Sequence, residues 1–154
     1  MLRITKLADY AIVVLSHLSA EQQGSSEKST ARNLSHRSGL PQPTVSKLLK
    51  ELARSGLVVS ERGLLGGYRL ARDANAITVA DIVHAVEGPI ALTECNLSEP
   101  EACGYAGACP VEANWIRIND AIVRALGSIS LAEMAKPFSP PLVRLSTKRE
   151  LAHA

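Results

Sequence analysis

The sequence predicts a mainly α-helical protein with a small β-wing: a winged helix-turn-helix, a cysteine-bearing loop and a long dimerisation helix. Three observations support this fold class. Apolar residues recur at helical spacing in several segments, which indicates amphipathic helices. A glycine-rich turn between two short β-prone runs follows the third of these segments. All three cysteines of the 154-residue chain lie in one polar stretch, CNLSEPEACGYAGAC, which is too rich in Gly, Ala, Pro and Glu to pack a core.

The first two helices are predicted before residue 40. Residues 4–18 place an apolar stripe on one face, and Thr5 is a suitable N-cap for this helix. The run EQQGSSEKS then predicts a polar loop. The second helix is expected to begin near Ser29 or Thr30 and to end at Gly39, a residue type that commonly terminates helices.

The third helix is predicted to follow Leu40-Pro41-Gln42-Pro43 and to end at Gly56. One face is apolar and the other is polar and basic, which is typical of the second helix of a helix-turn-helix. A helical hairpin with a solvated face is the alternative interpretation. In a helix-turn-helix this outer face enters the major groove of DNA. The candidate base contacts are Gln42, Thr44, Ser46 and Lys47, and the candidate phosphate contacts are Lys50 and Arg54.

A two-stranded wing is predicted next, from residues 56–60 and 68–70. The run from Arg62 to Gly67 forms its tip, where glycines would allow close approach to a DNA backbone. Arg62 is a candidate for insertion into a narrow A·T-rich minor groove. The Gly66-Gly67 pair lacks the lysine and the strand-to-helix context of a phosphate-binding P-loop.

The remaining chain is predicted to hold a helix over residues 78–86, a loop over 88–110, a long helix over 111–126 and a short helix near Ser130. Thr78 and Asp81 form the pattern of a capping box at the first of these helices. The long helix carries an apolar seam suited to self-association, although packing within its own subunit would need the same pattern. We therefore divide the chain into a DNA-binding domain (1–87), a cysteine loop (88–110), a dimerisation region (111–136) and a flexible tail (137–154).

The charge distribution favours a nucleic-acid partner. Residues 1–72 carry 11 Lys and Arg against 5 Asp and Glu, whereas residues 73–154 carry 6 against 10. A basic N-terminal half is expected of a module that binds phosphates, and an aromatic content of 3% disfavours single-strand binding by base stacking. The partner is therefore expected to be double-stranded DNA. No apolar run reaches the length of a membrane span, so we expect a cytoplasmic protein with no membrane partner.

The three cysteines indicate a metal site or a redox site. Disulfides are rare in the cytoplasm, and an odd number of cysteines argues further against a disulfide scaffold. An iron–sulfur cluster, a structural zinc ion and a metal-free thiol–disulfide switch are the three possibilities. The chain has no recognisable nucleophile motif or nucleotide fingerprint, so an enzyme is not expected.

Four segments carry a resemblance to a known family: LRITKLADYAIVVLSHL, GLPQPTVSKLLKELARSGLV, ERGLLGGYRLA and ITVADIVHAVEGPIALTEC. Their order and spacing resemble the winged-helix regulators that include IscR and NsrR, and within that family the SUF-system iron–sulfur assembly regulators. The likeness covers about residues 2–135. It implies a homodimer whose long helices cross. It also implies an iron–sulfur cluster, 2Fe–2S rather than 4Fe–4S, held by Cys95, Cys103 and Cys109.

Two features depart from the family pattern. The cysteine spacing is C-x7-C-x5-C, with a first gap longer than usual, and Glu112 stands where IscR-type members have a histidine. In NsrR-type members the fourth ligand is an N-terminal aspartate of the partner subunit, and Asp9 is at the matching position. The fourth ligand is therefore Asp9, Glu112, or a solvent or small-molecule ligand. A ligand other than a fourth thiolate makes a cluster more labile, which suits a sensor.

Overall fold

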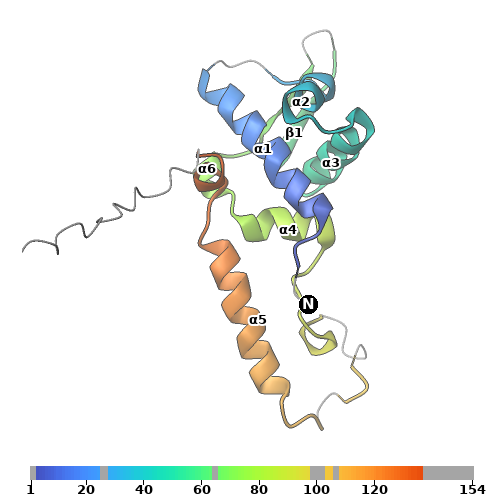
Figure 1. Ribbon diagram of the computed structural model, residues 1–154, viewed down its shortest axis with the longest axis vertical. Helices are drawn as coiled ribbons and strands as arrows, with labels where there is room; N and C mark the ends of the chain where they lie inside the picture. Colours follow the sequence, from blue (N-terminus) through green and yellow to red (C-terminus); the bar gives the residue numbers. More distant parts are fainter. Residues whose placement is uncertain (1–2, 25–27, 64–65, 98–102, 106–107, 137–154) are drawn as a thin grey trace, which may run out of the picture.

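Helices and one small sheet make up the computed structural model, which describes residues 3–24, 28–63, 66–97, 103–105 and 108–136 (Figure 1). In chain order the elements are α1 (Lys6–Gly24), α2 (Ala31–Ser38), α3 (Gln42–Arg54), β1 (Val58–Glu61), β2 (Gly67–Leu70), the 3-10 turn η1 (Ala74–Ala76), α4 (Val79–Glu87), the 3-10 turn η2 (Glu94–Asn96), α5 (Glu112–Gly127) and α6 (Leu131–Met134). This is the predicted fold class, and the differences lie mainly at element ends. The expected tail, residues 137–154, lies outside the described residues.

Helix α1 is longer than the sequence pattern predicts. It begins where Thr5 Oγ1 accepts a hydrogen bond from the backbone N–H of Ala8 at 3.2 Å, and it continues to Gly24 instead of ending at residue 18. The extra turns make tertiary contacts. Glu21 accepts a hydrogen bond from Arg37 at 2.6 Å, and Gln22 accepts one from the N–H of Leu70 at 3.3 Å. The expected loop therefore starts later than predicted.

Helices α2 and α3 form the helix-turn-helix. Thr30 caps α2 by accepting from Asn33 N–H, and Gly39 ends it with φ 69°, a left-handed conformation that favours glycine. Proline stands in the first turn of α3, where its missing N–H costs nothing. Ser29 lies outside α2 and instead forms an isolated bridge to Tyr68, with N–H···O distances of 3.1 and 2.8 Å.

The core lies between α1, α3 and α4. Fully buried leucines come from all three helices of the N-terminal half, and Ile77 and Ile82 close the core from the α4 side. The buried face of α3 is the predicted apolar stripe, consisting of Val45, Leu48, Leu49 and Leu52. Burying this stripe orients the opposite face of α3 outward, because side chains three and four residues apart share one side of a helix.

The wing is an antiparallel pair in which Val58 is opposite Leu70 and Glu61 is opposite Gly67. Its glycines are required by the hairpin itself. A Cβ atom at Gly66 would lie 2.5 Å from the carbonyl oxygen of Glu61, and one at Gly67 would lie 3.0 Å from the carbonyl oxygen of Ser29. Close packing of the chain on itself therefore explains the glycine pair without a DNA contact.

Helix α4 carries the predicted capping box between Thr78 and Asp81. Helix α5 extends away from the helix-turn-helix, with the cysteine-bearing segments at its far end (Figure 1). At its near end the chain returns to the body. Val79 N–H donates to the carbonyl of Ile129 at 2.9 Å, and Leu131 N–H donates to the carbonyl of Ile77 at 2.7 Å. No helix in the described part of the chain has the length and apolar character needed to cross a membrane.

Candidate nucleic-acid interface and cysteine loop

The outer face of α3 presents the predicted set of polar and basic side chains. Gln42, Lys47, Lys50 and Arg54 are exposed, while Thr44 and Ser46 are half-buried beside them. Arg54 also donates to Glu51 on the same helix at 3.0 Å. Ion pairs at such exposed positions contribute little stability, so a phosphate can compete for this guanidinium.

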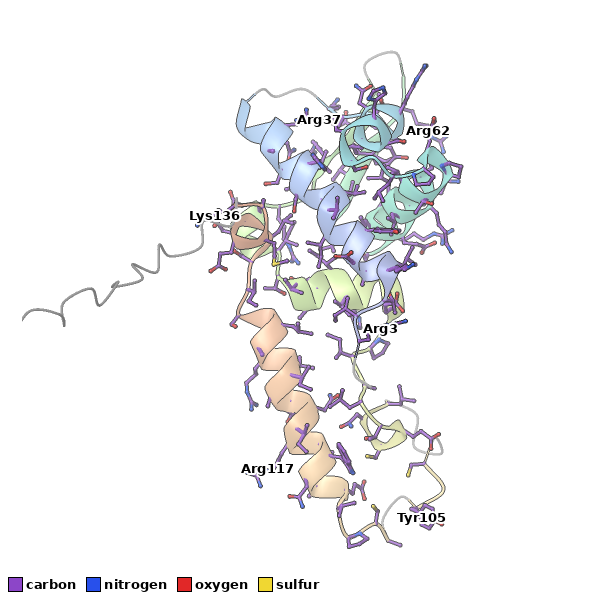
Figure 2. All side chains as sticks on the ribbon, in the orientation of Figure 1. Arg3, Arg37, Arg62, Tyr105, Arg117 and Lys136 are labelled. Carbon is purple, nitrogen blue, oxygen red and sulfur yellow. The ribbon has the colours of Figure 1, made fainter. Side chains whose placement is uncertain are left out.

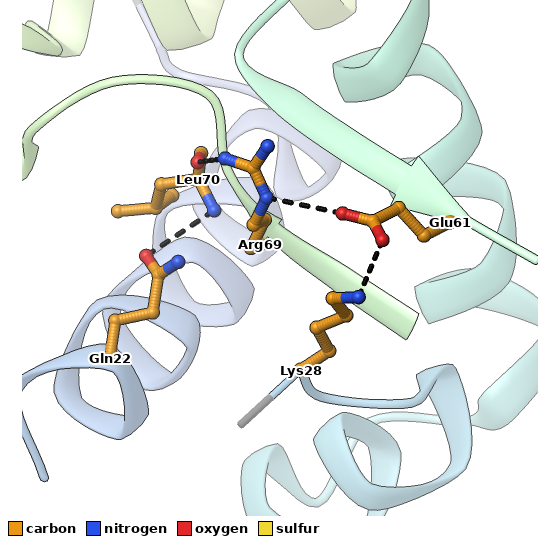
Figure 3. Close-up of polar contacts among 5 residues, drawn as sticks. All are labelled: Gln22, Lys28, Glu61, Arg69 and Leu70. Carbon is orange, nitrogen blue, oxygen red and sulfur yellow. Dashed lines mark hydrogen bonds and ion pairs between the residues drawn. The ribbon is translucent and has the colours of Figure 1, made fainter. Parts of the chain in front are cut away.

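The wing adds Arg62 and a cluster of three charged residues. Arg62 is exposed at the end of the molecule that carries α2 and α3, whereas Tyr105 and Arg117 lie at the opposite end (Figure 2). Beside Arg62, the Glu61 carboxylate binds Lys28 Nζ at 2.5 Å through one oxygen and Arg69 Nε at 3.4 Å through the other (Figure 3). Hydrogen bonds from Lys28 and then from Arg69 hold the pKa of Glu61 below its usual range.

Sequence reasoning missed this cluster. Lys28 and Glu61 are 33 residues apart, and no local pattern relates them. The sequence offers one local indication. Arg69 lies opposite Val59, and side chains alternate between the two faces of a strand, so Arg69 and Glu61 share the outward face of the hairpin.

The cysteine loop is partly ordered by side-chain hydrogen bonds near its first cysteine. Cys95 lies in η2, with its Sγ 3.0 Å from the hydroxyl of Thr93. Asn96 Nδ2 donates to the same hydroxyl at 2.7 Å. Thr93 therefore fixes the local direction of the first thiol, and this segment is not the structureless loop that composition predicts.

A buried amide connects the loop to α5. Asn119 is 8% exposed and is the sole buried residue on α5, and its Oδ1 accepts from the backbone N–H of Leu92 at 3.0 Å. At the other end of the loop, Glu112 N–H donates to the carbonyl of Cys109 at 3.4 Å. Both ends of the cysteine segment are thus attached to the same helix.

The three thiols suit a soft metal by their chemistry, but they are not arranged as a finished site. Cys95, Cys103 and Cys109 are free and half-buried. Across the described ranges, no group of three or more His, Cys, Asp or Glu side chains lies close enough to hold a metal ion. Asp9, exposed in the first turn of α1, belongs to no such group within one chain. The donor set, three cysteine sulfurs, is of the chemical type that an iron–sulfur centre uses.

Helix α5 leaves much of its apolar surface uncovered. The exposed fractions of Val111, Trp115 and Ile118, members of the predicted seam, are 46%, 40% and 45%. The remaining members, Ile122 and Leu126, are half-buried and line a pocket together with residues 3–5 and α4. The seam is thus divided between packing on the body and an open face.

The fold and the outer face of α3 define a protein of the winged-helix DNA-binding class. Residues 4–137 match the model of the Rrf2 family, described as iron-dependent transcriptional regulators, and the chain belongs to this family. It is 33% identical over 135 residues to the HTH-type transcriptional regulator IscR of Xenorhabdus nematophila, covering 88% of this chain and 80% of that protein. It is 28% identical to protein rrf2 of Nitratidesulfovibrio vulgaris, covering 90% of each chain.

Solved structures agree with the fold. The structure of CymR, the global cysteine regulator of B. subtilis, aligns with a TM-score of 0.65 and 30% identity, covering 88% of this chain and 97% of that one. The IscR of T. potens aligns with a TM-score of 0.63 and 28% identity, covering 86% and 85%. The expected resemblance to the IscR-containing family and the prediction that the chain is not an enzyme are confirmed.

Proposed function

We propose that this regulator binds a two-fold operator in double-stranded DNA as a homodimer and holds an iron–sulfur cluster at Cys95, Cys103 and Cys109. We further propose that it represses genes for iron–sulfur (SUF) cluster assembly. One observation supports the proposal above all. The segment that holds the three thiols is hydrogen-bonded at both of its ends to α5, and α5 leads back to the DNA-binding body.

Base recognition is assigned to the first turns of α3. Gln42, Thr44, Ser46 and Lys47 carry short polar or basic groups suited to base edges in the major groove. Lys50 and Arg54, further along the same face, contact phosphates. Lys50→Ala is expected to weaken binding to all sequences alike and to reduce the salt slope by about 0.9 for each phosphate that the protein no longer neutralises.

Arg62 at the wing tip is assigned to the minor groove. Narrow A·T-rich minor grooves have an enhanced negative potential that attracts guanidinium groups. Arg62→Ala should therefore weaken binding most when the operator is flanked by A·T pairs, measured by fluorescence anisotropy. Equal losses beside G·C flanks would exclude insertion of Arg62 into the groove.

The dimer is supported by the open apolar face of α5. Trp115 and Ile118 expose apolar surface that a second copy of the helix would cover. Two-fold symmetric operators are met by two-fold symmetric proteins, since each subunit supplies one recognition helix.

A bound iron–sulfur cluster would supply redox activity and an iron that is easily lost. The residues of the chain itself link the cluster segment to the DNA-binding body. We infer that a ligand held by the cysteines would act on α5 through the hydrogen bond between Leu92 and Asn119. Helix α5 in turn leads to Ile129, whose carbonyl accepts from Val79 at the start of α4. There Asp81 forms an ion pair with Arg72, just beyond β2 of the wing, at 2.9 Å.

Purification without oxygen tests the cluster directly. Brown protein with iron and acid-labile sulfide is expected, and each single cysteine-to-alanine variant should lose both. Colourless protein containing zinc would support a structural metal, and metal-free protein with a reversible disulfide would support a thiol switch.

The fourth ligand has its own test. Asp9→Ala should still take up iron and sulfide but show an altered absorption spectrum and faster loss in air, because a carboxylate is a harder ligand than a thiolate. If Glu112→Ala has this effect instead, the ligand lies at the start of α5. If neither variant matters, a solvent or small-molecule ligand completes the site. Asp9 is expected to come from the partner subunit.

A further inference from the structure

We propose that Lys28 and Arg69 form a second phosphate-binding site on the outward face of the wing, with Glu61 as the positioning residue that holds both cations. The ligand is the DNA backbone, at phosphates that α3 does not contact. This inference rests on the proposed DNA-binding surface and extends it to residues outside α3 and the wing tip.

The geometry gathers two cations on one carboxylate. Lys28 approaches Glu61 from the segment before α2, and Arg69 approaches it from β2 (Figure 3). The side chains of Lys28, Glu61 and Arg69 are 30%, 41% and 44% exposed, so solvent and a ligand can reach all three. Because its pKa is lowered by these two partners, Glu61 is ionised at neutral pH and the cluster carries a net positive charge.

Among the described residues, most hydrogen-bond donors of the two cations have no partner. Lys28 uses one of its three ammonium donors on Glu61. Arg69 uses Nε on Glu61 at 3.4 Å and Nη1 on the carbonyl of Leu70 at 3.5 Å, both long contacts that leave the rest of the guanidinium fork unused. A phosphate accepts several charge-assisted hydrogen bonds, which matches this donor set.

The cluster is fixed to the wing and is continuous with the proposed DNA surface. Lys28 precedes Ser29, whose backbone pairs with Tyr68 of β2. Glu61 directly precedes Arg62, and α2 begins three residues after Lys28. A helix N-terminus carries partial positive charge and is a frequent phosphate contact, so α2 adds to the positive potential here. The two cations therefore move with the wing as it meets DNA.

Glu61 has two opposing effects on this site. It orders the long side chains of Lys28 and Arg69, and it competes with phosphate for them. Exposed ion pairs are weak, so phosphate displaces the carboxylate, but the remaining negative charge lowers the affinity for any duplex. Glu61 therefore weakens binding to operator and unrelated duplexes alike.

The test is the salt dependence of duplex binding, which counts neutralised phosphates and is not changed by a purely structural role. The probes are a labelled duplex selected in vitro with the unmodified protein and a labelled duplex of unrelated sequence. The variant Lys28→Gln/Arg69→Gln is expected to weaken binding to both duplexes by the same factor. Its slope should be shallower by about 0.9 for each subunit on the DNA. Lys28→Arg/Arg69→Lys, which keeps both charges, should retain the slope.

Two further variants complete the design. Lys136→Gln removes a cation from the exposed region after α6 and should change neither affinity nor slope. Glu61→Gln should tighten binding to both duplexes. Weaker binding by Glu61→Gln, together with an unchanged slope in the double glutamine variant, would make the cluster a structural brace and overturn the proposal.

Lys50→Ala separates this inference from the proposed interface on α3. If only Lys50→Ala reduces the slope, the Lys28–Arg69 site is wrong and the α3 interface stands. If only the double glutamine variant reduces it, the Lys28–Arg69 site stands and the assignment of Lys50 is wrong. If neither variant reduces it, both assignments fail.

Discussion

The winged-helix body (α1 to α4, the wing and α6) and the arm (residues 88–127, as far as they are described) differ in where their apolar side chains lie. Every buried apolar residue of the described chain comes from the body, whereas the buried residue of the arm is the polar Asn119. The largest exposed apolar side chains gather mainly on the arm, including Trp115, Ile116 and Ile118. The body is therefore stabilised by its own core, whereas the arm leaves most of its large apolar side chains exposed.

The largest expected effect is the loss of the dimer when a charge is placed on the exposed apolar face of the arm. Ile118→Glu would place an unpaired charge in the proposed dimer interface, at a cost on the order of 3–5 kcal/mol for an uncompensated buried charge. Light scattering should show monomers, while circular dichroism should show an intact body.

Ala113→Glu is the matched control, because Ala113 is exposed on α5 away from the apolar seam. It should remain dimeric. A dimer that survives Ile118→Glu would place the interface elsewhere.

The second prediction concerns the body. Leu48 is fully buried on α3, and Leu48→Ala should lower the free energy of unfolding by about 2–5 kcal/mol through lost burial and the cavity left behind. Urea titration followed by circular dichroism measures the loss. Ile116→Ala, at an exposed position on α5, should change the same quantity by less than about 0.5 kcal/mol. Equal losses would break the comparison, because they would make α5 part of the same core.

A smaller effect is expected where the arm meets its loop. Asn119→Ala removes the acceptor for Leu92 N–H, at a cost of about 1 kcal/mol. Hydrogen exchange at the Leu92 amide should become faster, and iron uptake should slow because the thiols are held less firmly. Asn114→Ala, an exposed position on the same helix, should leave the exchange of Leu92 unchanged.

The smallest effect concerns the junction between body and arm. Hydrogen bonds from the backbone N–H and then the hydroxyl of Ser130 lower the pKa of Glu133 below 4.5. A depressed carboxyl pKa contributes stability that is present above the unfolded value and lost as pH falls through the folded value. Glu133→Gln should therefore lower the melting temperature slightly at neutral pH, and the difference should shrink below pH 4.5. A difference that does not vary with pH would exclude this charge-dependent cap.

Local patterns were sufficient to predict the fold. The helical stripes, the capping box at Thr78 and the glycine stop at Gly39 each depend on residues within one or two turns, and the structure contains all of them. Helix ends were predicted less well where tertiary contacts decide them. Helix α1 continues beyond residue 18, with Glu21 and Gln22 of its last turns bonded to Arg37 and Leu70.

The candidate site divides in the same way. The exposed face of α3 follows from helical periodicity alone, so its residues could be named from the sequence. The Lys28–Glu61 pair, the Ser29–Tyr68 bridge and the Asn119–Leu92 hydrogen bond join residues far apart in the chain, and no local pattern encodes them. The relative positions of the three thiols likewise cannot be predicted from local patterns, because the thiols lie in a loop and would be brought together by a bound group.

The buried amide of Asn119 has a consequence for how α5 can move. An apolar seam tolerates slippage by one helical turn, because one branched side chain can replace another at nearly the same free energy. Such a slip would bring Trp115 or Val123 opposite Leu92 N–H, and neither side chain can accept its hydrogen bond. The helix therefore has one discrete register against its loop, and leaving it means breaking a specific bond rather than sliding along a continuum. The same hydrogen bond that joins the loop to α5 thus also decides which residues of α5 face the loop.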